Sequence, residues 1–256
     1  MKVAFLHLEF SGGPVEDNLK KICLAIIKAA ESGAKCVVTP EIALQGYFFS
    51  EKADKLETVL VPNVSIEAIK NLAKEYQIII FLCCAEMDEN TGYYYNSCQV
   101  ISSEGEVISK QHKMSGHTIG AEAWSKKGDK FLPVQIGELK IGILICCDSW
   151  YVKNAETARY LDVDLILVPA AWNDYDCGGG MPEDAWKRCS EVSRAPVWVC
   201  NQTGNNERLD LNTAKSAVLV NGMTRLVYSG KPALLFFDWD KGRNNLISKK
   251  FEKIFV

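Results

Sequence analysis

Segments with strand-like and helix-like hydrophobic patterns alternate along all 256 residues, which restricts the chain to folds that mix sheets and helices. The first half predicts helices at 15–32 and 65–76 and strands at 3–9, 36–39, 78–86, 97–102 and 107–110. The second half repeats that order, with helices at 154–161 and 182–193 and strands at 131–136, 140–145, 165–169, 197–201, 217–220 and 226–228. Two such halves predict an α/β fold of two mixed sheets packed face to face under helices, a four-layer α-β-β-α sandwich. We expect residues 1–256 to form a single domain.

The stretch 142–148 reads Gly-Ile-Leu-Ile-Cys-Cys-Asp, an apolar run that stops at two thiols and a carboxylate. Such a run predicts a buried strand, and ligands bind just past the carboxyl ends of strands in open α/β sheets. Cys146 would then stand rigidly at a cleft, as a nucleophile must. We prefer it to Cys147 because successive strand residues point to opposite faces. The plain alternative is that both are buried cysteines acting as small hydrophobes.

Two charged residues stand in similar strand-terminal positions upstream. Glu41 follows the β-branched run 36–39 and a proline, and Lys113 follows the strand-like segment 107–110. Either residue alone is more often a solvated surface group. Together with Cys146 they form a set with a mechanism, because a thiol needs a base to become a thiolate. A carbonyl under attack also needs a cation or N–H donors for its oxyanion.

These motifs resemble the signature of the nitrilase superfamily of carbon–nitrogen hydrolases, a Glu–Lys–Cys triad in that chain order. The family motif P-E-x-x-x-x-G-Y matches the sequence at Pro40, Glu41, Gly46 and Tyr47. The motif G-x-x-I-C-Y-D matches at Gly142, Ile145, Cys146 and Asp148, with Cys147 in place of the usual aromatic residue. The resemblance runs from residue 2 to about residue 230 and includes the strand-like stretches 165–172 and 197–204.

The resemblance implies the α-β-β-α sandwich and assigns roles to individual residues. Cys146 would be the nucleophile and Glu41 the general base, while Lys113 and the backbone N–H of Cys147 would form the oxyanion hole. The family carries a second glutamate before a Gly-Asp, and Glu122, ahead of 128–129, is the candidate. It would orient Lys113 or the substrate. No metal and no cofactor are needed, and the family commonly forms homodimers or higher homo-oligomers.

The implied reaction is hydrolysis of a small amide or N-carbamoyl compound through a thioester, with release of ammonia or an amine. Within the family, C-x-D marks amidases and carbamoylases, whereas true nitrilases carry C-W-E. Nitrile hydrolysis by the same triad is therefore the alternative. Two other classes remain open: a catalytically silent ligand-binding relative, and a thiol redox protein using Cys146 and Cys147. The intact triad argues against the first, and the strained ring of an adjacent-cysteine disulfide argues against the second.

The substrate pocket is expected to include Tyr47, Trp124, Trp150, Tyr151 and Trp172, with Asn173 beside them, although a Trp/Tyr cluster is as often plain core. We expect segment 172–182, with glycines at 178–180, to be a mobile loop bordering the site. Its acids would favour neutral or amine-bearing amides; they are Asp174, Asp176, Glu183 and Asp184. The alternatives are that these acids cap the following helix, or that Arg188 and Arg194 reach inward and bind a carboxylate.

Composition excludes several other classes of protein. A formal net charge of −3 gives no electrostatic case for nucleic acid or an anionic membrane. No apolar run approaches the ~18 residues of a membrane span, and the N-terminus has no signal-peptide pattern. Ten cysteines without any C-x-x-C spacing do not support a zinc ribbon, and three histidines are too scattered for a metal site. We expect reduced thiols in a cytoplasmic protein.

Overall fold

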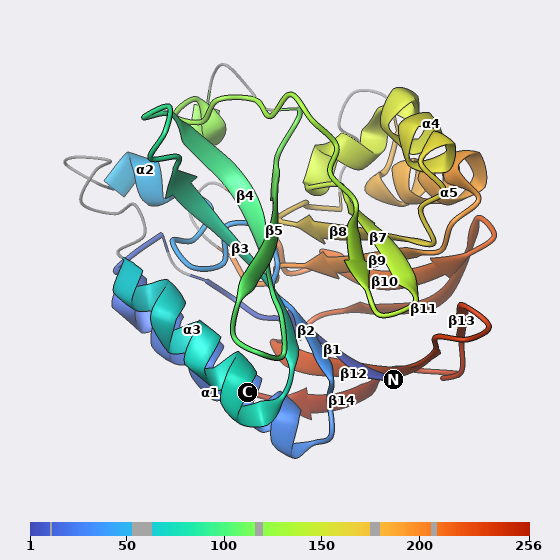
Figure 1. Cartoon of the computed structure of the whole chain (residues 1–256), viewed down its shortest axis with the longest axis horizontal. Coiled ribbons are helices and arrows are strands. Elements are labelled where there is room, and N and C mark those ends of the chain that lie inside the picture. Colours follow the sequence, from blue (N-terminus) through green and yellow to red (C-terminus); the bar gives the residue numbers. More distant parts are fainter. Residues whose placement is uncertain (11, 53–62, 116–119, 175–179, 206–208) are drawn as a thin grey trace.

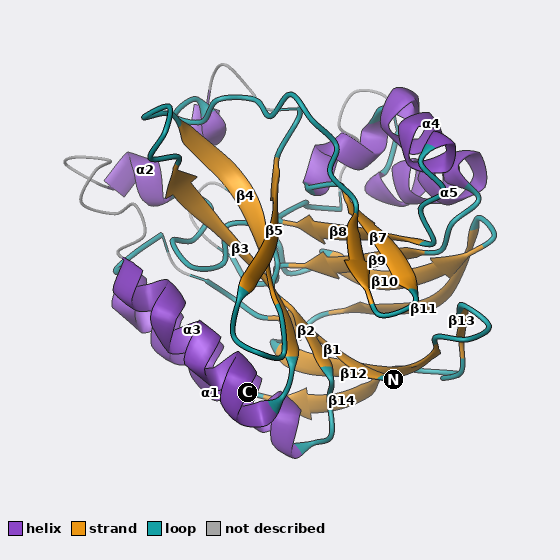
Figure 2. Cartoon of the chain, in the orientation of Figure 1, coloured by secondary structure: helices purple, strands orange, loops and turns teal. Residues whose placement is uncertain are grey.

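A computed structural model of the chain describes residues 1–10, 12–52, 63–115, 120–174, 180–205 and 209–256. Its strands form two sheets that pack face to face, and helices cover both outer faces (Figures 1 and 2). The predicted four-layer α-β-β-α sandwich is therefore confirmed. No helix in the described part of the chain combines the length and apolar character that a membrane crossing requires.

The first sheet has eight strands in the order β13-β12-β1-β2-β3-β4-β5, with β14 paired to β12. Neighbours β1, β2 and β3 run parallel, and the other pairs are antiparallel. The strand bounds are β1 (Lys2–His7), β2 (Cys36–Val38), β3 (Ile79–Met87), β4 (Tyr94–Ile101), β5 (Val107–His112), β12 (Ala233–Asp240), β13 (Asn245–Leu246) and β14 (Glu252–Phe255). The helices of this half are α1 (Val15–Glu31), α2 (Phe49–Lys52) and α3 (Asn63–Tyr76).

The second sheet has six strands in the order β11-β10-β9-β8-β7-β6, and its central strands β7, β8 and β9 are parallel. The strand bounds are β6 (Val134–Ile136), β7 (Leu139–Ile143), β8 (Leu165–Ala170), β9 (Val197–Asn201), β10 (Lys215–Val220) and β11 (Met223–Ser229). Helices α4 (Val152–Tyr160) and α5 (Pro182–Ser193) cover its outer face, and two short 3-10 turns are η2 (Gly120–Glu122) and η3 (Cys146–Trp150).

Strand β1 shows how one sequence serves two apolar layers. Val3 and Phe5 belong to the core between the sheets, where the Phe5 ring lies 5.0 Å from that of Phe237. Ala4 and Leu6 belong to the core under α1 and α3. Successive strand residues point to opposite faces, so a strand covered on both sides reads as a continuous apolar run. This is why the buried strands could be found from the sequence.

Helix α1 buries one stripe of its surface on the first sheet. Ile22, Ala25, Ile26 and Ala29 recur at helical spacing and are all buried. The helix ends before Gly33, whose φ of +88° is a left-handed conformation that glycine adopts without steric cost. The buried stripe of α1 therefore packs the helix against the first sheet as part of the outer layer.

The C-terminal apolar segment 233–237, whose partner the sequence did not identify, is part of β12. It pairs antiparallel with β1, with Leu234 opposite Leu6 and Leu235 opposite Phe5. The segment therefore packs within its own chain. Element bounds also differ from those predicted: the strand predicted at 140–145 ends at Ile143, and the chain turns into η3 three residues later.

Candidate active site

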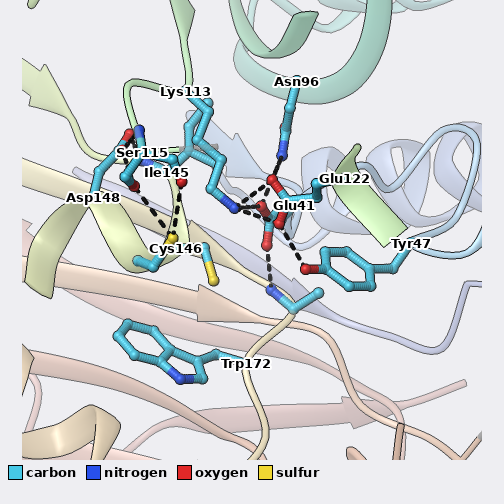
Figure 3. A network of polar contacts seen from close by, with 12 residues as sticks. Glu41, Tyr47, Asn96, Lys113, Ser115, Glu122, Ile145, Cys146, Asp148 and Trp172 are labelled. Atoms are coloured by element: carbon cyan, nitrogen blue, oxygen red, sulfur yellow. Dashed lines mark hydrogen bonds and ion pairs between the residues drawn. The ribbon is translucent and has the colours of Figure 1, made fainter. Parts of the chain in front are cut away.

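The predicted catalytic residues meet at one edge of the two sheets. Glu41 follows β2, Lys113 follows β5, Cys146 begins η3 after β7, and Glu122 ends η2. All four are buried, with at most 6% of any of them exposed. Figure 3 shows Lys113 pointing between the Glu41 and Glu122 carboxylates. Ligand sites form at the carboxyl ends of parallel strands, and here the strands of both sheets deliver side chains to the same place.

Lys113 is bonded to both carboxylates. Its Nζ donates to Oε1 of Glu41 at 2.7 Å, and to Oε1 and Oε2 of Glu122 at 2.6 and 2.8 Å. Burial alone would lower the pKa of Lys113, but the negative charges of Glu41 and Glu122 raise it well above its ordinary value. Burial would likewise raise the pKa of Glu122, yet Lys113 holds it below its usual range. Lys113 is therefore a permanent cation in this cluster.

Three further groups fix the carboxylates, and sequence reasoning missed two of them. Asn96 on β4 donates from Nδ2 to Glu41 Oε1 at 2.8 Å and to Glu122 Oε2 at 3.4 Å. The backbone N–H of Ala171 donates to Glu41 Oε2 at 3.0 Å. Asn96 directly precedes the predicted strand 97–102, next to the polar residues Ser97 and Gln99, so nothing in the sequence singles it out. A backbone donor leaves no signal in the sequence at all.

The third group is Tyr47, which was predicted to line the pocket and does so. Its hydroxyl also donates to Glu122 Oε1 at 2.6 Å. Burial, followed by the charges of Glu41 and Glu122, raises the pKa of Tyr47 well above its ordinary value. The phenol therefore keeps its proton and remains a hydrogen-bond donor to Glu122.

Cys146 lies on a turn and not on a strand, so the strand-alternation argument that favoured it over Cys147 is wrong. Its φ of +51° is a left-handed conformation that is uncommon outside glycine. The Asp148 carboxylate holds this turn by accepting N–H bonds from Ile145 at 3.1 Å and from Ser115 at 2.7 Å. Asp148 thereby ties the cysteine turn to the segment that follows Lys113.

The two adjacent thiols have different surroundings. Cys147 Sγ lies 3.3 Å from the backbone oxygen of Ser115 and 3.2 Å from its Oγ. Cys147 is therefore bonded to the segment that follows Lys113, and this contact distinguishes it from Cys146 where strand alternation does not.

The ionisation of the two thiols is coupled through a hydrogen bond between them. Burial, that hydrogen bond and the charge of Glu41 raise the pKa of Cys146 well above its ordinary value. The same hydrogen bond lowers the pKa of Cys147 to about 7, against its burial. Cys146 is thus protonated at rest and requires a base to become a nucleophile. The lower pKa of Cys147 makes a direct comparison of the two cysteines necessary.

A pocket of about 340 Å³ opens onto these groups. Tyr47, Trp150, Tyr151, Trp172 and Asn173, which were predicted to line the pocket, lie in its wall. Trp124 was predicted there too, but it is not among the lining residues, and its ring packs against that of Phe49 at 5.0 Å. The remaining lining residues are Phe48, Lys113, Glu122, Cys146, Cys147, Ala171 and Leu209. Five of the twelve lining residues are aromatic, so a small molecule entering the pocket would meet apolar rings together with the two thiols and a fixed cation.

Part of the loop predicted to border the pocket, residues 175–179, lies outside the described residues, and Asp176 is in that part. Asp174 and Glu183 both pair with Lys215, at 2.9 and 2.8 Å. Asp184 accepts the N–H of Met181 at 3.2 Å, as a helix-capping acid does. Lys215 therefore offsets one of the two charges on Asp174 and Glu183, and Asp184 caps helix α5, which is the alternative that the sequence left open for it. The effect of these acids on substrate charge stays a prediction.

The two arginines proposed as carboxylate ligands are placed elsewhere. Arg188 donates to the backbone oxygen of Trp150 at 3.1 Å, and its guanidinium lies 5.2 Å from the centre of that ring. Arg194 is exposed at the carboxyl end of α5. Neither lines the pocket. Within the described residues, no group of three or more His, Cys, Asp or Glu side chains could hold a metal ion, and no two of the nine cysteines form a disulfide.

Comparison with known proteins gives consistent matches. The family model described as carbon-nitrogen hydrolase matches residues 4–225. A citrullinase of Francisella tularensis is 28% identical over 228 residues, which cover 82% of this chain and 77% of the citrullinase. Omega-amidase NIT2-B of Xenopus laevis is 29% identical over 180 residues, covering 65% of this chain and 62% of that protein.

Among solved structures, a mutant amidase from Nesterenkonia sp. AN1 superimposes with a TM-score of 0.82 over 95% of this chain and 92% of that one. In that amidase the acetamide moiety of fluoroacetamide is covalently added at the active-site cysteine. The two chains are 19% identical, so this likeness establishes a shared fold.

Proposed function

The chain belongs to the carbon–nitrogen hydrolase family of the nitrilase superfamily, and we propose that it hydrolyses a small linear amide or N-carbamoyl compound through a thioester on Cys146. One observation carries the proposal. A protonated thiol on a tight turn faces a buried lysine that is fixed between two glutamates, at the end of an aromatic pocket. Relatives named citrullinase and omega-amidase support C–N bond hydrolysis as the reaction class.

The proposed acylation begins with proton transfer from Cys146 to Glu41. The thiolate attacks the carbonyl carbon, and the oxyanion is stabilised by the Lys113 ammonium and the backbone N–H of Cys147. Glu41 then returns the proton to the leaving nitrogen, so ammonia or an amine departs and a thioester remains. The covalent adduct on the active-site cysteine of the Nesterenkonia amidase supports a cysteine nucleophile here.

The proposed deacylation uses the same groups in reverse order. Glu41 takes a proton from water, the hydroxide attacks the thioester, and the Cys146 thiolate leaves and regains its proton. Glu122 takes no proton in this scheme. It holds Lys113 through two bonds and is itself held by Tyr47, so it keeps the ammonium directed at the developing charge.

Ammonia release from a panel of short amides, ω-amides and N-carbamoyl amines tests this proposal. We expect turnover by the wild type, loss of turnover with unchanged folding in Cys146→Ala, and measurable turnover in Cys147→Ala, which keeps its backbone N–H. Equal loss in both variants would contradict the assignment of Cys146. Turnover confined to nitriles would favour the nitrilase alternative, and ligand binding without turnover would favour a silent relative.

Three coarser properties are part of the same proposal. We propose that residues 1–256 act as one catalytic domain, that the protein works in the cytoplasm with reduced thiols, and that it forms a homodimer. The dimer rests on family resemblance, since β12 already has its partner within the chain. Light scattering at micromolar concentration tests it, and a particle of 28.5 kDa would contradict the dimer.

A further inference from the structure

The backbone of Ala171 and Trp172 touches the proposed base and also carries one wall of the pocket. The Ala171 N–H binds Glu41 Oε2 at 3.0 Å, and the ring of Trp172 lies 6.0 Å from that of Trp150 across the pocket lining. Strand β8 ends at Ala170, so these two residues lie beyond the sheet ladder. Their placement relative to Glu41 therefore depends on contacts outside the strand.

Asn201 supplies those contacts from the end of the neighbouring strand β9. Its Oδ1 accepts the N–H of Trp172 at 2.9 Å, and its Nδ2 donates to the carbonyl oxygen of Trp172 at 2.8 Å. The Asn201 side chain is fully buried, so water does not compete for either bond. A buried amide with both ends satisfied fixes the orientation of the backbone it binds.

Two further residues hold Asn201. The hydroxyl oxygen of Ser216, on β10, accepts the N–H of Asn201 at 2.9 Å. The same hydroxyl lies 2.9 Å from Nδ1 of His7, the last residue of β1 in the other sheet. Burial lowers the pKa of His7 to about 4, although the backbone of Asn201 and of Gly230 opposes this. The neutral ring thus links the two sheets behind the site.

From this geometry we infer that Asn201, held by Ser216 and His7, is a positioning residue that fixes the Glu41 carboxylate through the Ala171 backbone. Glu41 Oε1 is bound by Lys113 and Asn96, and Oε2 is bound by Ala171. A carboxylate held at both oxygens cannot rotate away from the proton it has to take. The inference rests on the proposed function, because it acts through the proposed base.

The test changes Asn201 or Ser216, which together we call the clamp, and leaves every pocket-lining residue in place. Asn201→Leu removes both side-chain bonds to Trp172 at similar volume, and we expect kcat to fall by about 100-fold, as for a misplaced catalytic group. Ser216→Ala should lower kcat by about 10-fold, because it only loosens the clamp. In both variants the fall in kcat should exceed the change in KM.

The comparison of kcat with KM separates positioning from general damage to the fold. A damaged fold would weaken substrate binding as well, whereas a displaced Glu41 carboxylate should lower kcat and leave KM close to its wild-type value. The matched control is Gln202→Leu. Gln202 is an equally buried amide on the next residue, but its Nε2 donates to the backbone oxygen of Phe10 at 3.0 Å, away from the site. It should keep the wild-type kcat and KM.

Each outcome decides the inference. A wild-type kcat in folded Asn201→Leu overturns it, and so does an equal fall in kcat in Gln202→Leu. If Asn201→Leu does not fold, Ser216→Ala decides by the same two readouts. Cys146→Ala is assayed in parallel. Turnover by that variant defeats the proposed function itself, whereas an inactive Cys146→Ala beside fully active clamp variants defeats only the role of Asn201.

Discussion

Two charge clusters lie on neighbouring parts of the first sheet, and one of them lines the pocket described above. Lys113 is bonded to Glu41 and Glu122, and all three side chains are at most 2% exposed. The other cluster, built on Glu86, receives bonds from Lys110 at 2.9 Å and from His112 at 2.8 Å. There the Glu86 carboxylate is 6% exposed, but the Lys110 side chain is 48% exposed.

A buried carboxylate with a shifted pKa does not by itself mark a catalytic site. Burial opposes the ionisation of Glu86, yet its bonds from His112 and Lys110 lower its pKa to about 2. No nucleophile is bonded to it, and its cation reaches solvent. In the other cluster one ammonium serves two carboxylates, which leaves a net charge of −1, and a thiol stands beside it. The Glu86 cluster therefore has the character of a stabilising ion pair, whereas the Lys113 cluster has the groups that an acyl-transfer reaction needs.

Lys113→Met should have the largest effect on kcat of any substitution in the two clusters. It removes the cation proposed to stabilise the oxyanion, so kcat should fall by at least ~100-fold. Glu41→Gln removes the proposed proton acceptor and should cause a loss of similar size. Steady-state kinetics on the best amide measures both. A near-normal kcat in either variant would show that the proposed triad is wrong at that position.

Glu86→Gln should instead affect stability and leave kcat nearly unchanged. The folded-state pKa of Glu86 is about 2 against an ordinary 4.5, so its charge contributes stability above about pH 4.5 that is lost as the pH falls toward 2. We expect the variant to lose about 2 to 3 kcal/mol of unfolding free energy at pH 7, and much less near pH 2. Urea unfolding at several pH values measures this. A constant difference across that range would contradict it.

The net charge of the catalytic cluster should appear in substrate preference. Lys113 is the one cation among the described lining residues, and its bonds go to Glu41 and Glu122. An ω-carboxy amide should therefore have a kcat/KM about 10-fold below that of a neutral amide of equal length, which corresponds to about 1.4 kcal/mol. An ω-amino amide should not suffer this loss. Preference for the carboxylate substrate would indicate a cation outside the described lining.

Lys110→Met should have the smallest effect. Lys110 is bonded to Glu86 but is half exposed, and ion pairs open to solvent contribute about 1 kcal/mol or less. Thermal unfolding should show a small decrease, and kcat should not change. A large loss of activity would mean that the Glu86 cluster also affects catalysis, and it would contradict a purely stabilising role for that cluster.

The sequence predicted the fold, and it predicted the positions of the proposed catalytic residues, because both leave local signals. Apolar runs mark the buried strands, and Glu41 and Cys146 each follow such a run, whereas Lys113 follows the half-exposed strand β5. Tyr47 and Trp172 were predicted to line the pocket as aromatic residues near those strand ends, and the structure places both there.

The ion pairs around the pocket, the pairing of the C-terminal strand and the turn at Cys146 depend on contacts between residues that a local sequence pattern does not encode. Lys215 lies far along the chain from Asp174, yet the two pair at 2.9 Å, which offsets part of the charge expected at the mouth. Strand β12 pairs with β1, at the opposite end of the chain. Leu144 and Ile145 were predicted as the end of the strand at 140–145 because they continue the apolar run, although Asp148 accepts the Ile145 N–H and the chain turns there.

The most direct test of the central claim is mass spectrometry of the protein quenched during turnover of a small amide. The account predicts an acyl group on the peptide that contains Cys146, and fragmentation should locate it on that residue and not on Cys147. The adduct should be absent from Cys146→Ala and present in Cys147→Ala. An acyl group on Cys147 in the wild type, no adduct on either cysteine under turnover, or the loss of two hydrogens across the pair would contradict the account.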